Sequence, residues 1–203
     1  MTSKNLIIVG AGGHAKSVSE IAIKLGFYIT GYLDDFSNEP NVIGKLMDIP
    51  KYSNHQFVMG IGGITNLDFR NQIIEHFKPF HHQFINLVSP HALISSNVKM
   101  GIGNTVHPFA FVNQEVEIKN FCIINTRAIV EHDCKIGNNV HISTGAIVNG
   151  NVMMGDNVFI GSGALIKNNV SICSNVIIGM GSVVLHSIHE PGTYVGNPLK
   201  KIK

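Results

Sequence analysis

Every sixth residue of this chain from Val88 to Val184 is apolar, without exception. A period of six fits neither an α-helix, with about 3.6 residues per turn, nor the two-residue alternation of a hairpin sheet. It fits a parallel β-helix in which three hexads form one triangular coil of 18 residues. Small or β-branched residues stand four positions after almost every one of these, as a tight interior corner requires. The pattern therefore predicts a solenoid whose coils stack about 4.8 Å apart.

The coil frame also predicts where the cysteines point. The chain has three cysteines, and two of them, Cys122 and Cys134, fall on inward positions of different coil faces. We expect both to be small core residues rather than a disulfide or a metal-binding pair.

Composition limits the classes of partner. Charged residues make up 14% of the chain and the net charge is +2, so we expect no nucleic-acid partner. No apolar run reaches the length of a membrane span, and Leu6–Val9 is too short for a signal peptide. These features favour a cytoplasmic protein without a membrane partner.

The segment before the repeats has a different pattern. Short apolar runs at Leu6–Val9, Phe27–Leu33 and Phe57–Ile61 predict three strands, with helical spacing after the first strand and again over Asn66–Phe77. This βαβ order predicts a small parallel sheet. We expect an α/β Rossmann-like domain over residues 1–86, an all-β parallel β-helix over 87–188 and a C-terminal tail over 189–203.

A glycine-rich turn follows the first predicted strand. Gly10, Gly12 and Ala15 match the dinucleotide pattern G-x-G-x-x-A, and Asp34 lies about twenty residues further on. Three strands are half of a dinucleotide fold, and the chain offers no separate domain for hydride transfer. Free N–H groups at a helix start favour phosphate, and a carboxylate after the next strand can accept a hydrogen bond from a sugar or a base. A nucleotide-linked ligand fits these features, and a purely structural turn remains open.

The densest group of reactive side chains in the repeats surrounds His132. This residue is the third of its hexad and is predicted to point outward. Imidazole titrates near neutral pH and suits general-base work, and Asp133 is placed to hold the ring in one tautomer. One coil on is Gly150, which leaves space beside the ring and exposes a backbone N–H suited to an oxyanion.

Two other interpretations of these histidines stay open. His132 can be an ordinary surface histidine, since the chain contains 11 histidines. His107, His132 and His141 can also be compared with the zinc ligands of hexad-repeat carbonic anhydrases, but their separations do not match that spacing.

Five segments together resemble one family, the bacterial sugar acyltransferases of the sialic acid O-acetyltransferase type. This group includes the N-acetyltransferases that modify UDP-4-amino-sugars in surface-glycan pathways. The matching segments are Ile8–His14, Gly31–Asp35, Gly60–Gly62, Ile124–Cys134 with its V-E-H-D-C motif, and the tail Val195–Lys200. The resemblance covers the whole chain.

The resemblance implies a fold, a cosubstrate and a site. It implies a left-handed β-helix, a homotrimer with active sites between subunits, acetyl-CoA in the cleft between neighbouring helices, and no metal. His132 would be the general base and Asp133 its orienting carboxylate. The implied acetyl-CoA contacts are His141, the Gly150 backbone, Asn197 and Pro198. The implied contacts to a nucleotide-sugar substrate are Gly12, Gly13, His14, Asp34, Asp35, Gly62 and Asn125.

These expectations converge on acetyl transfer from acetyl-CoA to the amino group of a nucleotide-linked amino-sugar. O-acetylation of a sialic-acid-like hydroxyl is the alternative, because the same base serves a hydroxyl or an amine. A non-enzymatic scaffold is a third possibility, although a scaffold would not need the N-terminal domain.

Overall fold

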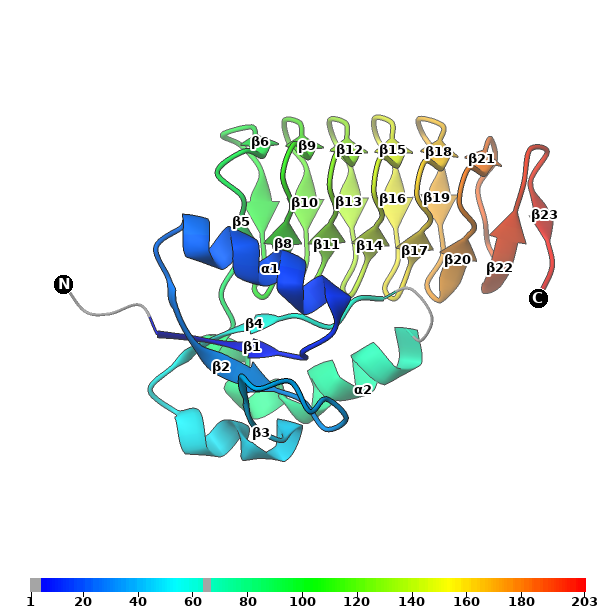
Figure 1. Cartoon of the computed structure of the whole chain (residues 1–203). Coiled ribbons are helices and arrows are strands. Elements are labelled where there is room, and N and C mark those ends of the chain that lie inside the picture. The colour runs from blue at the N-terminus through cyan, green and yellow to red at the C-terminus, as the bar shows by residue number, and fades with distance from the viewer. Residues whose placement is uncertain (1–4, 64–66) are drawn as a thin grey trace.

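The N-terminal part of the chain folds as a four-stranded parallel sheet with helices around it (Figure 1). The structure, a computed structural model, describes residues 5–63 and 67–203. The sheet has the order β3-β2-β1-β4. Its elements are β1 (Asn5–Val9), α1 (Gly13–Lys24), β2 (Tyr28–Leu33), β3 (Val42–Gly44), the 3₁₀ helix η1 (Leu46–Tyr52), β4 (Gln56–Met59), α2 (Leu67–His76) and the 3₁₀ helix η2 (Lys78–Gln83).

The Rossmann-like prediction is confirmed in its order of elements, but the expected number of strands is wrong. The fourth strand, β3, has only three residues and lies at the edge of the sheet beside β2. It lacks the long apolar run that marks a buried strand, so the sequence pattern does not identify it. The predicted helix start at Asn66 lies outside the described residues. None of the described helices is long and apolar enough to cross a membrane.

The remainder of the chain forms a parallel β-helix, consistent with the left-handed form, with three faces. Each strand pairs with the strand 18 residues further on, as Glu117 does with Lys135. Face I consists of β5 (Leu87–Val88), β8 (Thr105–Val106), β11 (Ile123–Ile124), β14 (His141–Ile142), β17 (Phe159–Ile160), β20 (Val176–Ile178), β22 (Gly192–Val195) and β23 (Lys200–Lys201). Face II consists of β6 (Leu93–Ile94), β9 (Phe111–Val112), β12 (Ile129–Val130), β15 (Ile147–Val148), β18 (Leu165–Ile166) and β21 (Val183–Val184). Face III consists of β7 (Lys99–Met100), β10 (Glu117–Ile118), β13 (Lys135–Ile136), β16 (Met153–Met154) and β19 (Ser171–Ile172).

The hexad residues fill the interior of this prism. Each is the second residue of a two-residue strand, so its side chain points inward while the first residue points outward. Cys122 and Cys134 are fully buried in the same core, and all three cysteines are free thiols. The predicted inward placement of both is therefore confirmed.

The corners of the prism explain why asparagine, aspartate and glycine are frequent in the repeats. At each corner the backbone adopts a positive φ in successive coils, as at Asp133 (61°), Asn151 (57°) and Asn169 (60°). Asparagine and aspartate tolerate this left-handed conformation better than other non-glycine residues do. The corners turn sharply without inserting a loop.

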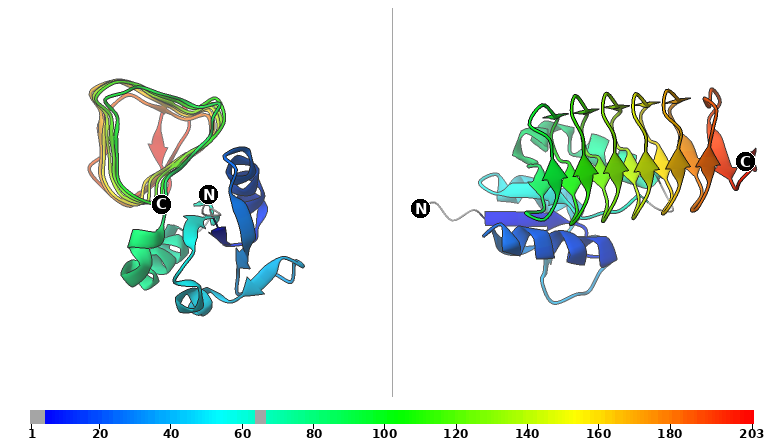
Figure 2. Two further views of the ribbon diagram at one scale, coloured as in Figure 1. Left: turned by 90° about the vertical axis from the view of Figure 1, so that its left-hand side faces the viewer. Right: turned by 90° about the horizontal axis from the view of Figure 1, so that it is seen from above.

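The three faces differ in what covers them. Figure 2 shows the N-terminal domain against one side of the triangular section, and that side is face I. The outward residues of face I are buried, among them Leu87, Ile123 and His141. The outward row of face II is apolar in every coil and partly or fully exposed; it consists of Leu93, Phe111, Ile129, Ile147, Leu165 and Val183. The outward row of face III begins with charged residues, and Lys99 pairs with Glu117 at 3.1 Å.

Candidate active site

His132 and Asp133 form a hydrogen-bonded pair at the corner between faces II and III. The His132 Nδ1–H donates to Asp133 Oδ2 at 2.7 Å. A carboxylate only accepts, so this bond fixes the tautomer and leaves the Nε2 lone pair free to take a proton. The two side chains are 59% and 58% exposed, so the pair is open to a reactant. This arrangement can serve a general base.

Gly150 lies directly beneath the His132 ring. A Cβ added at Gly150 would stand 2.7 Å from His132 Cε1 and 2.8 Å from Nε2, closer than real Cβ contacts come. Only glycine fits here without moving the imidazole. In the part of the chain that the structure describes, the Gly150 N–H has no hydrogen-bond partner. A base and a free N–H donor are therefore adjacent, as acyl transfer requires.

A polar pocket of about 430 Å³ opens at this corner. It contains His132 and Gly150 and continues one coil on to Asn168 and Asn169. A second pocket, of about 460 Å³, lies at the C-terminal end of the solenoid and includes His186, one coil beyond Asn168. Pro198 lines this second pocket. An elongated ligand can follow the corner from the base toward the C-terminal end.

The glycine-rich turn lines a third pocket, of about 450 Å³, in the N-terminal domain. Its wall includes Gly12, Gly13 and His14 at the start of α1, with Gly62 from the loop after β4. Gly12 is the N-cap residue of α1, and the first turn of the helix carries no acidic side chain. The N–H groups of this turn are suited to an anion such as phosphate.

Asp34 holds the shape of that pocket from within the protein. Its carboxylate accepts hydrogen bonds from the N–H groups of Ala11 (2.7 Å), Phe36 (2.8 Å) and Ser37 (2.8 Å). Burial works to raise the pKa of Asp34, but these three donors, with Lys45 nearby, outweigh it and hold the pKa below its usual value. Asp34 therefore fixes the glycine turn against the end of β2.

Asp35 is the more open of the two neighbouring carboxylates. It is exposed, lines the pocket, and accepts a hydrogen bond through Oδ1 from the Leu46 N–H at 2.9 Å. Asp35 can therefore reach a ligand more readily than Asp34.

Three histidines meet where α1 packs on face I. The ring of His14 lies 5.1 Å from the ring of His107 and 6.3 Å from that of His141, centroid to centroid. Burial lowers the pKa of His14 to about 3, with contributions from His107 and Arg70, and burial lowers the pKa of His107 to about 4. Burial likewise holds the pKa of His141 well below its usual value. All three rings are neutral at pH 7.

Asn125 completes this cluster, and two of its ring nitrogens stay open. The Asn125 side-chain nitrogen lies 3.4 Å from His141 Nε2, and the Gly63 N–H donates to His141 Nδ1 at 3.3 Å. The Nε2 atoms of His14 and His107 are buried without a hydrogen-bond partner among the described residues. These atoms are available to a polar group of a ligand.

The predicted site residues therefore fall into two groups within one chain. His132, Asp133 and Gly150 lie at the corner opposite face I, whereas His141 and Asn125 lie with the N-terminal pocket on face I. A side of the prism of six residues spans at most about 20 Å at about 3.3 Å per residue, a gap that no side chain bridges. This separation also divides the three zinc-ligand candidates, since His132 is apart from His107 and His141. No group of three side chains able to hold a metal ion occurs in residues 5–63 and 67–203.

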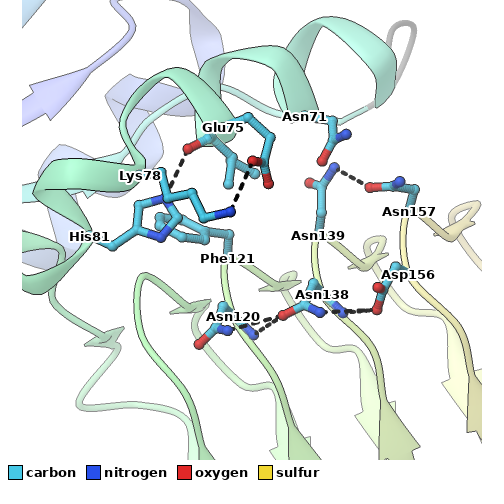
Figure 3. A pocket seen from close by; sticks show the side chains of 11 residues that line it. Asn71, Glu75, Lys78, His81, Asn120, Phe121, Asn138, Asn139, Asp156 and Asn157 are labelled. Atoms are coloured by element: carbon cyan, nitrogen blue, oxygen red, sulfur yellow. Dashed lines mark hydrogen bonds and ion pairs between the residues drawn. The ribbon is translucent and has the colours of Figure 1, made fainter.

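Sequence reasoning did not identify Arg70 or the site of His107. Arg70 is 1% exposed and lies between α2 and the solenoid. A signal for it exists, because Arg70 shares one helical face with Ile73, Ile74 and Phe77, where a charged residue is unexpected. A further pocket, of about 390 Å³, lies beside it between α2 and the corner that joins faces III and I (Figure 3).

Two family models match parts of the chain. Residues 5–77 match the PglD N-terminal domain, and residues 151–186 match the bacterial transferase hexapeptide family with six repeats. A curated relative, the uncharacterized protein L142 of Acanthamoeba polyphaga mimivirus, is 35% identical over 115 residues. The match takes in 52% of this chain and only 22% of the length of that protein.

Solved structures match the chain over nearly its full length. The acetyltransferase domain of PglB from Neisseria gonorrhoeae is 32% identical, with a TM-score of 0.91 over 98% of this chain and 100% of that chain. The same domain has been solved in complex with acetyl coenzyme A. A histidine-to-asparagine variant of perosamine N-acetyltransferase from Caulobacter crescentus, in complex with CoA and GDP-perosamine, is 26% identical, with a TM-score of 0.90 over 98% and 97% of the two chains. With this fold, this N-terminal domain and this likeness, the chain belongs to the hexapeptide-repeat sugar acetyltransferases, a family of acyltransferase enzymes.

Proposed function

We propose that this protein transfers the acetyl group of acetyl-CoA to the amino group of a nucleotide-linked amino-sugar of the UDP-4-amino-sugar type. The observation that carries the proposal is the His132–Asp133 pair with Gly150 beneath the ring. The relatives with bound acetyl-CoA, or with CoA and GDP-perosamine, support the same class of donor and acceptor. We place the reaction in bacterial surface-glycan synthesis in the cytoplasm.

In the proposed reaction the amine nitrogen attacks the thioester carbonyl. His132 Nε2 takes a proton from the amine, and Asp133 stabilises the imidazolium through Nδ1–H. The Gly150 N–H donates to the developing oxyanion. The C–N bond then forms as the C–S bond breaks, and the thiolate of coenzyme A leaves and receives the proton from His132. No acyl-enzyme forms, because burial raises the pKa of the neighbouring Cys134 thiol to about 11.

The two ligands occupy different parts of the protein in this proposal. The acceptor nucleotide binds in the pocket of Gly12, Gly13, His14 and Gly62, with its phosphates at the start of α1 and Asp35 at the sugar or base. Asp34 acts indirectly, by holding the glycine turn. Acetyl-CoA extends from Gly150 along the corner toward Asn197 and Pro198, and its acetyl end meets the partner's His141 and the partner's Asn125.

A homotrimer brings these parts together. Face I is already covered by the N-terminal domain of the same chain, whereas face II presents an apolar row in every coil. Exposed apolar surface of this extent is typical of an interface between copies. Because His132 lies at the edge of face II, a neighbouring copy packed there places its acceptor pocket beside the base.

An acceptor panel tests the reaction itself. UDP-, GDP- and dTDP-linked amino-sugars, CMP-sialic acid and free sialic acid are offered with acetyl-CoA, and release of the free thiol is measured. We expect turnover with a nucleotide-linked amine. Turnover confined to a sialic acid would favour O-acetylation, and no thiol release with any acceptor would favour a scaffold.

The His132→Ala variant tests the base. We expect kcat to fall by about 10²–10⁴-fold with little change in acetyl-CoA affinity, since the imidazole contributes to proton transfer. Near wild-type turnover in this variant would overturn the assignment of His132.

A further inference from the structure

Arg70 is the one guanidinium that the fold buries completely, and it lies on the apolar face of α2. Burial lowers its pKa to about 10, so it remains charged at pH 7. No carboxylate forms an ion pair with it in the described part of the chain. A buried charge without an ion-pair partner is costly, and an apolar side chain would fill the same space at less cost. Arg70 is therefore poorly explained by packing alone.

The hydrogen bonds of Arg70 join three separate segments. Its Nε–H donates to the Ile61 carbonyl at 2.8 Å, in the loop after β4. One terminal nitrogen donates to the Phe121 carbonyl at 2.9 Å and also to the side-chain oxygen of Asn139. Phe121 and Asn139 lie in successive coils at the corner between faces III and I. The planar guanidinium suits this arrangement, because its donors point in fixed directions.

The loop held by Arg70 forms one wall of the acceptor pocket. Ile61 and Gly62 line that pocket, and the Gly63 N–H donates to His141. The Ile61 side chain also packs so closely on Gly10 that a Cβ at Gly10 would stand 2.6 Å from its Cγ1. A shift of Ile61 would therefore move both the glycine turn and the contact with His141.

We propose that Arg70 is a positioning residue of the acceptor site, which fixes the loop Gly60–Gly63 to the solenoid corner and so sets the acceptor pocket relative to His141. This inference rests on the proposed function, since it assigns that pocket to the nucleotide-sugar. The charge of Arg70 has a second effect, because it helps to lower the pKa of His14 and His141 and keeps both rings neutral.

Three variants separate this role from general stability. Arg70→Lys keeps the charge but loses the fork of donors, and Asn139→Gly removes one acceptor while leaving Arg70 in place. Asn157→Gly is the matched control, since Asn157 stands one coil beyond Asn139 with the same positive φ (57° against 53°). Figure 3 shows Asn139 and Asn157 side by side at this corner, joined by the 2.9 Å hydrogen bond that either glycine variant removes. Only Asn139 contacts Arg70.

We expect KM for the nucleotide-sugar to rise about tenfold in Arg70→Lys and Asn139→Gly, which corresponds to one hydrogen bond to a charged group. KM for acetyl-CoA should stay within about twofold, and Asn157→Gly should behave as wild type in both. Amide hydrogen exchange over residues 60–63, measured on the ligand-free protein, should speed up in the first two variants only. If Arg70→Lys does not fold, Asn139→Gly against Asn157→Gly decides the question.

Unchanged acceptor KM and unchanged exchange in Arg70→Lys and Asn139→Gly would overturn the inference. Equal effects in Asn139→Gly and Asn157→Gly would also overturn it, because they would trace the change to the asparagine ladder. The exchange measurement needs no substrate. If the wild-type protein acetylates no acceptor, the proposed function fails, and the exchange data still decide whether Arg70 holds the loop.

Discussion

Gly150→Ala is the substitution that most directly tests the geometry around His132. A methyl group at residue 150 would lie 2.7 Å from Cε1 and 2.8 Å from Nε2 of the ring, where ordinary contact begins at 3.4 Å. Gly150 is not among the glycines with positive φ, so the backbone accepts alanine without strain. The perturbation is therefore a contact between one methyl group and one imidazole, which must move by roughly 1 Å to relieve it.

That movement predicts a loss of turnover with little loss of stability. A misplacement of about 1 Å in a reacting group can cost about 10²-fold in rate, equivalent to about 2.7 kcal/mol in activation free energy. His132 is 59% exposed and has solvent to move into, so the ring swings away from Asp133 instead of straining the core. Breaking that exposed pair costs at most about 1 kcal/mol, and we expect the melting temperature to fall by no more than a few degrees.

The assay is thiol release from acetyl-CoA with the best acceptor from the panel, with thermal unfolding measured on the same preparation. Gln114→Ala is the control, because Gln114 is exposed at the same corner one coil before His132 and lies outside the pocket. It should retain wild-type kcat. Wild-type kcat in Gly150→Ala, or an equal loss in Gln114→Ala, would refute the account of the site.

Three further predictions concern stability and assembly. Ile147→Asp, on the apolar row of face II, should convert the trimer to monomers in analytical ultracentrifugation, whereas Met153→Asp on face III should not; trimers in both variants would refute the assignment of face II. Asp34→Asn should lower the free energy of unfolding by about 1–3 kcal/mol in urea, because an amide accepts the three N–H donors less strongly. The folded pKa of Asp34 is below its ordinary value of 3.8, so this difference should be complete above pH 3.8 and disappear as the pH falls through the folded pKa; a difference that persists in full would contradict it. Burial lowers the pKa of His107 from 6.5 to about 4, so between these values the unfolded state binds a proton that the folded state does not, and stability should fall with pH by about 1.4 kcal/mol per unit for this residue. His107→Asn should show a shallower pH dependence of the urea midpoint, and an unchanged slope would contradict the assignment.

The period of six was sufficient to predict the solenoid because every coil repeats the same packing problem. Whichever residue follows the corner must fill the interior, so Ile124, Val130 and Ile136 are apolar and fully or almost fully buried. The same frame placed Gly150 next to His132, since positions 18 residues apart are stacked neighbours. These contacts depend only on distance along the chain, which a sequence records.

Contacts between segments that follow no period were beyond the sequence pattern. Nothing in the spacing says that Asp34 accepts hydrogen bonds from the glycine turn, because that depends on how the loop after β2 folds back. Arg70 was missed for the same reason, since its acceptors lie 9, 51 and 69 residues away. The edge strand β3 is too short and too exposed to carry a pattern of its own.

The distance between His132 and His141 shows how the repeat bears on assembly. The two residues are nine positions apart, which is half of an 18-residue coil, so they lie on opposite sides of the prism. A single chain therefore cannot direct both at one thioester. The side of the solenoid that carries His141 is covered by its own N-terminal domain, and the side next to His132 is apolar and open. The arrangement requires a second copy to complete the site, so dissociation by Ile147→Asp should abolish turnover even though every residue of the base remains in place.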